Sequence, residues 1–240
     1  MTKLYVYGIV GATHFSDKLP NGHDEAPVFA IVSGDLAVAV SSLERSAVEV
    51  SAENVWLHEN VLSALMERHS VLPMRFGTIS AGAAQLLGGI VKRRGQLMKD
   101  LARLDGKVEI ALRISGKNRE KVEPRITGQI ADSTVIQGAA YLQEKQQNLY
   151  GSFDTQSSVQ CVRRAIRSQL DPLIVEAIWP TDEPQMLPFR ASCLIKKNDV
   201  ARFVQVVDDV VVNDSDTRVT CTGPWAPYSF VGQSGSETET

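Results

Sequence analysis

The chain has 240 residues, of which 43 % are hydrophobic and 22 % charged, and its formal net charge at pH 7 is -3. This composition is typical of soluble globular proteins, and the length suits two modest domains or one large one. The weak net charge argues against nucleic acid as a partner, and no apolar run approaches the ~20 residues that a membrane span needs.

The first elements in chain order are a strand and a hairpin. Residues 4–10 (LYVYGIV) are rich in strand-forming residues, and a loop rich in Gly, Pro, Asn and Asp follows. Two short apolar runs at 28–32 and 36–40 then flank Gly34. Because glycine adopts the positive φ that a tight turn needs, these runs are expected to form a hairpin.

Two helices follow the hairpin. Ser51 is a suitable N-cap for the first, and Ser80 for the second, which Gly106 ends. The packed face of the first helix is expected to carry Val55, His58, Leu62, Leu65, Met66 and His69. His58 is therefore interpreted as a core histidine, in preference to a ligand or base. The basic residues of the second helix, Lys92, Arg93, Arg94 and Lys99, are interpreted as a solvated face, with an acidic-partner patch as the alternative.

The second half of the chain begins with its clearest strand. Residues 107–115 (KVEIALRIS) alternate strictly between apolar and polar residues. A polar loop is expected after Gly116, then a helix from Ser133 to about Tyr150. A further helix is expected over 155–178, with a kink or break at Pro172. The remaining predicted elements are a strand at 189–195, a short helix capped by Asn198, and a last strand at 218–222.

This order of elements predicts an α+β protein of two domains. Residues 1–106 are expected to form a small sheet with two helices. Residues 107–231 are expected to form a modified ferredoxin-like sandwich with a strand missing or displaced, ending in an aromatic segment. Residues 232–240 (GQSGSETET) are expected to be a disordered tail.

No catalytic or metal-binding signature is present in the sequence. The three cysteines, Cys161, Cys193 and Cys221, are odd in number and far apart, which is typical of a reducing cytoplasm. No two histidines have close metal-ligand spacing, and there is no HExxH, GxSxG or phosphate-binding glycine loop. We therefore expect no catalytic residue, metal or cofactor.

Several stretches together resemble one known family. VLPMRFGT at 71–78 and TGPWAPYSFV at 222–231 resemble signature segments of the gas vesicle protein GvpL/GvpF family. LYVYGIV resembles its first strand, HENVL at 58–62 its first helix, and GAAYLQEKQQ at 138–147 a later helix. The segments occur in the family's order and span nearly the whole chain. Ala226 departs from the family, which often has another proline there.

The resemblance implies a function that composition does not show. Members of this family are cytoplasmic accessory or minor structural proteins of gas vesicles. They take part in assembling the hollow shell and contact GvpA, the small amphipathic shell subunit, and other accessory proteins are further candidate partners. Neither catalysis nor a cofactor is implied, and no membrane or nucleic-acid contact is expected.

The closing aromatic segment has two interpretations. In the first, Pro224, Trp225, Tyr228 and Phe230 form a structural clasp that wraps back and covers a gap between domains. In the second, the same aromatic side chains contact a partner. We favour the clasp, because such apolar residues near a chain end need covering.

The VLPMRFGT segment is the second candidate site. Alternation predicts that Leu72, Met74 and Phe76 share one face and that Arg75 lies on the other, and Pro73 marks a sheet edge. Leu72, Met74, Arg75 and Phe76 are the predicted partner-binding residues. With the alternating strand at 108–114, this edge suggests that GvpA is held by strand addition.

Two other classes of function stay open at this stage. An enzyme with an unrecognised pocket would need converging acids or bases. The adjacent carboxylates Asp208 and Asp209, and the nearby pair Glu120 and Glu123, are interpreted as solvated surface groups. A small-molecule sensor is the third possibility, by fold analogy alone.

Overall fold

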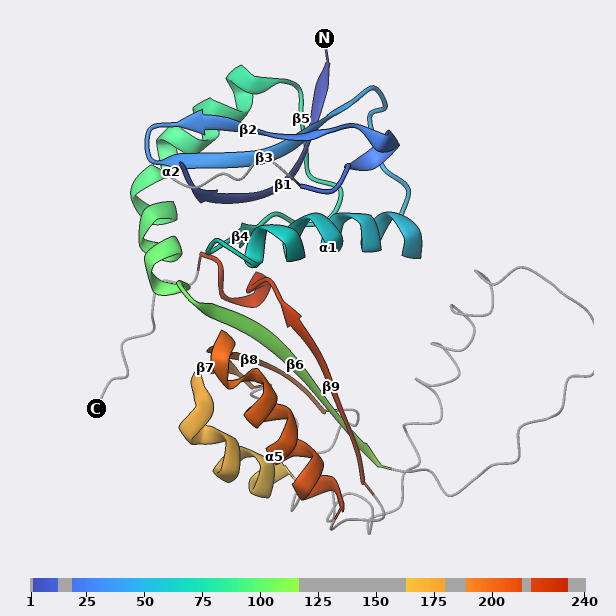
Figure 1. Ribbon diagram of the computed structural model, residues 1–240, viewed down its shortest axis with the longest axis vertical. Helices are drawn as coiled ribbons and strands as arrows, with labels where there is room; N and C mark the ends of the chain where they lie inside the picture. The colour runs from blue at the N-terminus through green and yellow to red at the C-terminus, as the bar shows by residue number, and fades with distance from the viewer. Residues whose placement is uncertain (1, 13–18, 117–162, 180–188, 213–216, 233–240) are drawn as a thin grey trace, which may run out of the picture. The chain divides into compact units, whose positions relative to one another are not determined.

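The computed structural model describes residues 2–12, 19–116, 163–179, 189–212 and 217–232 (Figure 1). It is a mixed helix-and-sheet structure with two antiparallel sheets. The predicted loop after Gly116, the predicted helix from Ser133 and the predicted tail from residue 233 onward lie outside the described residues.

The chain divides into two units. Unit 1 comprises Met1–Ile110, Leu194–Lys197 and Gly223–Thr240, and unit 2 comprises Ala111–Cys193 and Asn198–Thr222. The closing segment thus belongs to the same unit as the N-terminal residues, whereas the sequence-based boundary grouped it with 107–231. The two domains of the sequence analysis stay a prediction.

The sheet of unit 1 is built around its first strand. The strand order is β2-β3-β1-β4, and β5 also pairs with β1. The strands are β1 (Lys3–Gly11), β2 (Val28–Ser33), β3 (Leu36–Leu43), β4 (Leu72–Pro73) and β5 (Ile79–Ser80). The predicted first strand and hairpin are confirmed, and Gly34 has the positive φ of 60° that the turn requires.

A β-bulge in β1 sets which side chains face which helix. The register against β3 shifts between Val6 and Gly8. The bulge changes the alternation, so one face carries Leu4, Val6 and Ile9, and the other carries Tyr5, Tyr7 and Val10. Helix α2 (Ala83–Arg103) packs on the first face and α1 (Ala52–Met66) on the second. Unit 1 is therefore a helix–sheet–helix arrangement, with the central strand buried on both sides.

A glycine lets the short strand β4 approach β1 closely. Gly8 pairs with Pro73, and a Cβ at Gly8 would lie 2.9 Å from a methyl of Val71 and 3.1 Å from the carbonyl oxygen of Leu72. Real Cβ atoms do not tolerate the shorter distance. This close approach places the VLPMRFGT segment against the central strand.

The two helices of unit 1 begin in different ways. The predicted N-cap of α1 is confirmed, because the Ser51 hydroxyl accepts from the backbone N–H of Asn54 at 3.2 Å. The prediction that Ser80 caps α2 is wrong, since Ser80 pairs with Leu4 in β5 and the helix begins only after Gly82. The side chain of Gln85 reaches back instead and accepts from the N–H of Ala81 at 2.9 Å.

The second sheet has the strand order β7-β8-β6-β9. Its elements are β6 (Lys107–Gly116), a helix over 163–170, β7 (Ile174–Ile178), β8 (Phe189–Lys196), α5 (Val200–Val212) and β9 (Thr217–Trp225). The alternating strand β6 is confirmed, but it has a neighbour on each side and is not an open edge. The predicted break at Pro172 is confirmed, because the helix ends at residue 170 and a 3₁₀ turn containing Pro172 follows. The prediction of helix beyond this break is wrong, since Ile174–Ile178, which include the β-branched Ile174 and Val175, form strand β7.

The N-cap of α1 provides a test of this fold. Replacing Ser51 by alanine leaves the N–H of Asn54 without its side-chain acceptor, so we expect a loss of about 1 kcal/mol of stability. Urea denaturation measures it. Ser46→Ala, at an exposed bend position just before the helix, is the matched control and is expected to change stability little. Equal losses in both variants would contradict the assigned cap.

Candidate functional site

A cleft of about 610 Å³ lies on unit 1 between the short strands and helix α2. Its floor is apolar, and the side chains that form it come from β1, β4, β5 and α2. These are Val6, Ile9, Leu72, Pro73, Ile79, Leu86, Ile90 and Leu97. Polar groups at the cleft include two exposed arginines, Arg75 and Arg93. Such a surface suits a ligand with an apolar face.

The structure divides the four predicted partner-binding residues. Leu72, Met74 and Arg75 line the cleft, with Leu72 buried and Arg75 exposed. Phe76 does not, because it packs into the cluster on the α1 side of the sheet. The prediction that Leu72, Met74 and Phe76 share one face is therefore wrong. The chain leaves the strand after Pro73 and turns, with the N–H of Thr78 bonded to the carbonyl of Arg75.

The closing segment reaches the wall of the same cleft. Tyr228 and Val231 line the cleft, and Phe230 is completely buried in the core cluster on the α2 side. Ala226 is buried in the cluster on the α1 side. Trp225 lies 6.5 Å from Trp56, measured between ring centroids. The peptide bond between Gly223 and Pro224 is cis, and Pro224 is exposed.

Two buried carboxylates hold the backbone of this segment. The carboxylate of Glu109 accepts from the backbone N–H of Ser229 at 2.9 Å and from its hydroxyl at 2.6 Å. Asp100 accepts from the N–H of Gly232 at 3.2 Å, and Arg103 donates to the carbonyl of Phe230. Because Glu109 and Asp100 are nearly inaccessible to solvent, these bonds are charge-assisted contacts in a shielded environment.

Glycine is required where the segment begins. Gly223 has a φ of 122°, a conformation that side chains rarely adopt. A Cβ there would also lie 2.8 Å from the carbonyl oxygen of Glu109. Both constraints bring the start of the segment close to β6.

A buried hydrogen-bond network joins the segment to the cleft through His58. Its Nδ1 lies 3.0 Å from the hydroxyl of Tyr5, which in turn accepts from the N–H of Gly77. Its Nε2 lies 3.1 Å from both the carbonyl oxygen of Met74 and the hydroxyl of Tyr228. A neutral imidazole that carries its proton on Nε2 fits these contacts. Tyr5 then donates to Nδ1, and the Nε2 proton is shared between the carbonyl of Met74 and the hydroxyl of Tyr228, which itself donates to Glu59.

The electrostatics of this network favour neutral side chains. Burial lowers the pKa of His58 from 6.5 to about 4, and burial also lowers the pKa of His23. Burial raises the pKa of Glu59, although the hydrogen bond that Tyr228 donates to Glu59 at 2.7 Å acts in the opposite direction. The predicted core role of His58 is confirmed by its burial. The network is thus a packed structural element, with no exposed acid or base for catalysis among its described members.

Other described residues give no sign of a catalytic centre. Among the residues described by the structure, no group of three or more His, Cys, Asp or Glu is placed to hold a metal. Asp208 and Asp209 are exposed on α5, and Asp209 bonds to Gln205 one turn earlier, whereas Glu120 and Glu123 lie outside the described residues. Neither Cys193 nor Cys221 is part of a disulfide. No helix in the described part of the chain is long and apolar enough to span a bilayer.

The fold is shared with solved gas vesicle proteins. The crystal structure of GvpF from Anabaena superposes with a TM-score of 0.74 at 20 % identity and covers 98 % of each chain. That of GvpF from Microcystis aeruginosa gives 0.72 at 21 % identity, over 97 % of this chain and 100 % of the other. These likenesses show that the chain shares the fold of the two GvpF structures.

Sequence comparison identifies the family. The model of the gas vesicle synthesis protein GvpL/GvpF family matches residues 3–232. Gas vesicle protein F1 of Halobacterium salinarum is 25 % identical over 95 % of this chain and 92 % of its own length. Gas vesicle protein F of a Streptomyces species is 26 % identical over 95 % of this chain and 98 % of its own length. The chain belongs to the GvpL/GvpF family, and this membership implies a role in gas vesicle formation.

The titration of His58 gives a pH-dependent prediction. Because its pKa falls from 6.5 to about 4 on folding, the unfolded chain binds more protons between these values. The contribution of His58 to the free energy of unfolding is therefore fully present above pH 6.5 and is lost as the pH falls toward 4. This loss is at most about 3 kcal/mol. Denaturation at a series of pH values measures this slope. Glu59, whose pKa is raised, acts in the opposite direction.

The control for the titration is His58→Gln, which keeps a donor for the carbonyl of Met74 but does not titrate. The variant is expected to be less stable at pH 7 and to lose less stability on acidification than the parent chain. Identical slopes in the two proteins between pH 6.5 and 4 would contradict the assignment.

The attachment of the closing segment predicts a local effect of Glu109. Glu109→Ala removes both acceptors of Ser229, so we expect faster hydrogen exchange at the amide of Ser229 and a loss of about 2–3 kcal/mol. Glu109→Gln retains one acceptor for Ser229, so we expect it to lower the stability less than Glu109→Ala does. Glu53→Ala, an exposed carboxylate on α1, is the control. Unchanged exchange at Ser229 in Glu109→Ala would refute this attachment.

Proposed function

We propose that this protein is an accessory or minor structural protein of gas vesicles that binds the shell subunit GvpA through the cleft on unit 1. The observation that supports this proposal is an apolar cleft in a member of a gas vesicle family. An amphipathic shell subunit exposes an apolar face before it is assembled, and burial of that face in the cleft prevents its aggregation. Catalysis plays no part in this function.

The mode of binding that we propose is burial of apolar side chains. Strand addition needs unpaired backbone groups at a sheet edge. The N–H of Met74 already donates to the carbonyl of Tyr7, and the carbonyl of Thr78 already accepts from the N–H of Val6. Pro73 has no N–H to offer. The VLPMRFGT segment therefore contributes the side chains of Leu72 and Met74 in preference to its backbone.

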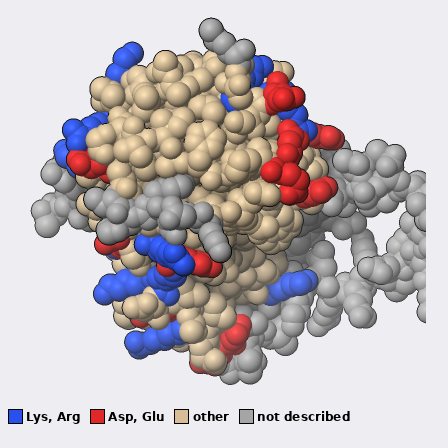
Figure 2. Space-filling model, turned by 45° about the horizontal axis from the view of Figure 1, so that its top comes forward, with Lys and Arg blue, Asp and Glu red and all other residues tan. Residues whose placement is uncertain are grey.

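The surface charge is compatible with a protein partner. On the face of the molecule shown in Figure 2, a wide area is uncharged, and both acidic and basic side chains are present at its margins. Arg94 forms an ion pair with Asp35, and Arg75 and Arg93 line the cleft. A mixture of both signs suits a protein partner better than a polyanionic nucleic acid.

Within this function, the closing segment acts as a structural clasp. Phe230 fills the core on the α2 side, and Tyr228 joins the cleft wall to the His58 network. Pro224 and Pro227 reduce the entropy that the unfolded segment loses on docking. The contacts described for Trp225 and Phe230 lie within unit 1, and the role of the clasp in covering a gap between domains stays a prediction.

We further propose that unit 2 is a ferredoxin-like domain. Its strand and helix order, β6, helix, β7, β8, α5 and β9, follows the βαββαβ pattern of that fold. The sheet order β7-β8-β6-β9 supports the same assignment without a missing strand. The absence of a disulfide at Cys193 and Cys221 and the family support action in the cytoplasm, at the forming gas vesicle.

Binding is tested with charged substitutions in the cleft. Met74→Glu combined with Leu86→Glu places two carboxylates against the apolar floor, so we expect the amount of GvpA that co-purifies on co-expression to fall at least about tenfold. Val91→Glu is the matched control, because Val91 is 63 % exposed on the same helix and does not line the cleft.

Thermal unfolding of each variant shows whether the chain is still folded. A folded double variant that retains GvpA, or a control that loses it equally, would refute binding in the cleft. Co-purification of GvpA with the Val91→Glu control, but not with the folded double variant, would support binding in the cleft.

A further inference from the structure

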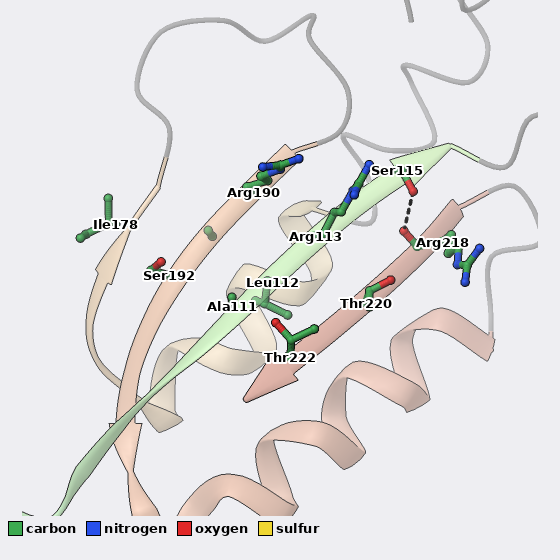
Figure 3. Close-up of a pocket in the computed structure, with 11 residues that line it drawn as sticks. Ala111, Leu112, Arg113, Ser115, Ile178, Arg190, Ser192, Arg218, Thr220 and Thr222 are labelled. Carbon is green, nitrogen blue, oxygen red and sulfur yellow. Dashed lines mark hydrogen bonds between the residues drawn. The ribbon is translucent and has the colours of Figure 1, made fainter. Parts of the chain in front are cut away.

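A second hollow, of about 810 Å³, lies on unit 2 (Figure 3). Eleven described residues line it, and Figure 3 shows that they come from strands β7, β8, β6 and β9, with the helices passing behind the sheet. Neither α5 nor the helix over 163–170 contributes a lining residue. The hollow therefore belongs to one face of the sheet itself.

Strand alternation explains the polar character of this face. On β6, Leu112 and Ile114 are completely or almost completely buried, which turns Arg113 and Ser115 to the opposite face. On β8 the buried Cys193 likewise turns Ser192 outward. One face of the sheet is thus apolar, and the other carries hydroxyls and guanidinium groups.

Three adjacent strands each contribute one arginine to the hollow. Arg190 comes from β8, Arg113 from β6 and Arg218 from β9, and these strands are neighbours in the sheet. Figure 3 shows all three arginines toward the same end of the strands, near Ser115. Neighbouring strands lie about 4.8 Å apart, so the positive charge extends over about 10 Å across the sheet.

The lining contains no carboxylate to neutralise this charge. None of the eleven lining residues is Asp or Glu. Arg45, Arg94 and Arg103 form ion pairs elsewhere in the chain, away from the hollow. Arg113 has an interaction of its own within the chain, as does Glu176 on β7, which is not a lining residue. Arg190 and Arg218, both exposed, are therefore the main candidates for an external anion.

The other lining residues restrict the kind of ligand. Thr220 adds a hydroxyl, whereas the hydroxyl of Ser115 donates to the carbonyl of Arg218 at 3.5 Å and Ser192 has an interaction of its own within the chain. No aromatic side chain lines the hollow, so it has no ring on which a nucleobase would stack. Its volume is within the range of small-molecule sites. Guanidinium groups bind phosphate and carboxylate oxygens through paired, charge-assisted hydrogen bonds.

We propose that this face of unit 2 binds a small, multiply charged oxyanion, whose negative groups bridge Arg190 and Arg218 and accept a further hydrogen bond from the hydroxyl of Thr220. The site is separate from the cleft on unit 1 and does not depend on GvpA binding. It gives the protein a place at which a soluble phosphate or carboxylate compound is bound.

Isothermal titration calorimetry of the full chain tests the proposal, at a fixed ionic strength of about 150 mM to limit nonspecific attraction. Sodium tripolyphosphate and citrate are the two probes, which separate a phosphate ligand from a carboxylate ligand. We expect saturable one-to-one binding of at least one probe. The double variant Arg190→Gln, Arg218→Gln is expected to bind it at least about tenfold more weakly.

The matched control is Arg164→Gln with Arg202→Gln. Both arginines are exposed on helices of unit 2, outside the hollow, and the change in net charge is the same. This variant is expected to bind within about twofold of the parent chain. The variant Arg190→Lys with Arg218→Lys keeps the charge but loses the paired donors. Its affinity for the probe is expected to lie between that of the parent chain and that of the Arg190→Gln, Arg218→Gln variant.

Three results would overturn the proposal. They are no saturable binding of either probe by the parent chain, equal weakening in the two glutamine double variants, and tighter binding of a poly-glutamate peptide than of either small anion. The last result would instead assign the face to an acidic protein segment. Circular dichroism of each variant confirms that the chain is folded, so that a loss of binding is assigned to the substituted arginines.

Discussion

The structure of unit 1 depends on the burial of strand β1 on both faces. Leu4, Val6 and Ile9 face α2, and Tyr5 and Tyr7 face α1. Burial of two tyrosines requires partners for their hydroxyls, because an unpaired buried hydroxyl costs about 1–3 kcal/mol. The hydroxyl of Tyr7 meets the Ser41 hydroxyl at 3.0 Å and the N–H of His23 at 3.1 Å, and that of Tyr5 bonds to His58 and Gly77. These requirements fix the positions of segments far apart in the sequence.

The same requirements shape the cleft and its wall. The bonds of Tyr5 to Gly77 and of His58 to Met74 hold the segment between β4 and β5 against the central strand, where it borders the cleft. Tyr228 extends the network into the closing segment, whose backbone is bonded to Glu109 and Asp100. A rigid wall of this kind lowers the entropic cost of binding a partner, since little of it needs ordering on contact.

The sequence predicted those elements that have a strong local signal. The hairpin at Gly34, the Ser51 cap and the alternation of 107–115 are local features, and each is confirmed. The predictions that failed are those in which tertiary contacts override a local sequence signal. Ser80 resembles a helix cap, but its pairing with Leu4 places it in a strand. The helix breaks at Pro172 as expected, but strand β7 follows the break in place of more helix. Phe76 was assigned to the wrong face because the turn after Pro73 ends the alternation.

The candidate sites were only partly accessible to sequence reasoning. Leu72, Met74 and Arg75 were identified from one motif, but the opposite wall of the cleft, which includes Leu86 and Ile90, comes from a helix with no local link to that motif. Glu109 and Arg113 were visible as the polar positions of an alternating strand, but nothing in the alternation indicates that Glu109 would bond the closing segment. Sheet order brings Arg190 and Arg218 to either side of Arg113, and long-range strand order is not encoded in local patterns.

The most direct test of the central claim is site-specific photo-cross-linking during gas vesicle assembly. A benzophenone amino acid is placed at Leu86 in the cleft and, in a second protein, at Val91, which lies outside it on the same helix. The proposed function predicts a cross-link to GvpA from position 86 and little or none from position 91. A cross-link from position 91 alone, or equal yields from the two positions, would contradict binding of the shell subunit in the cleft.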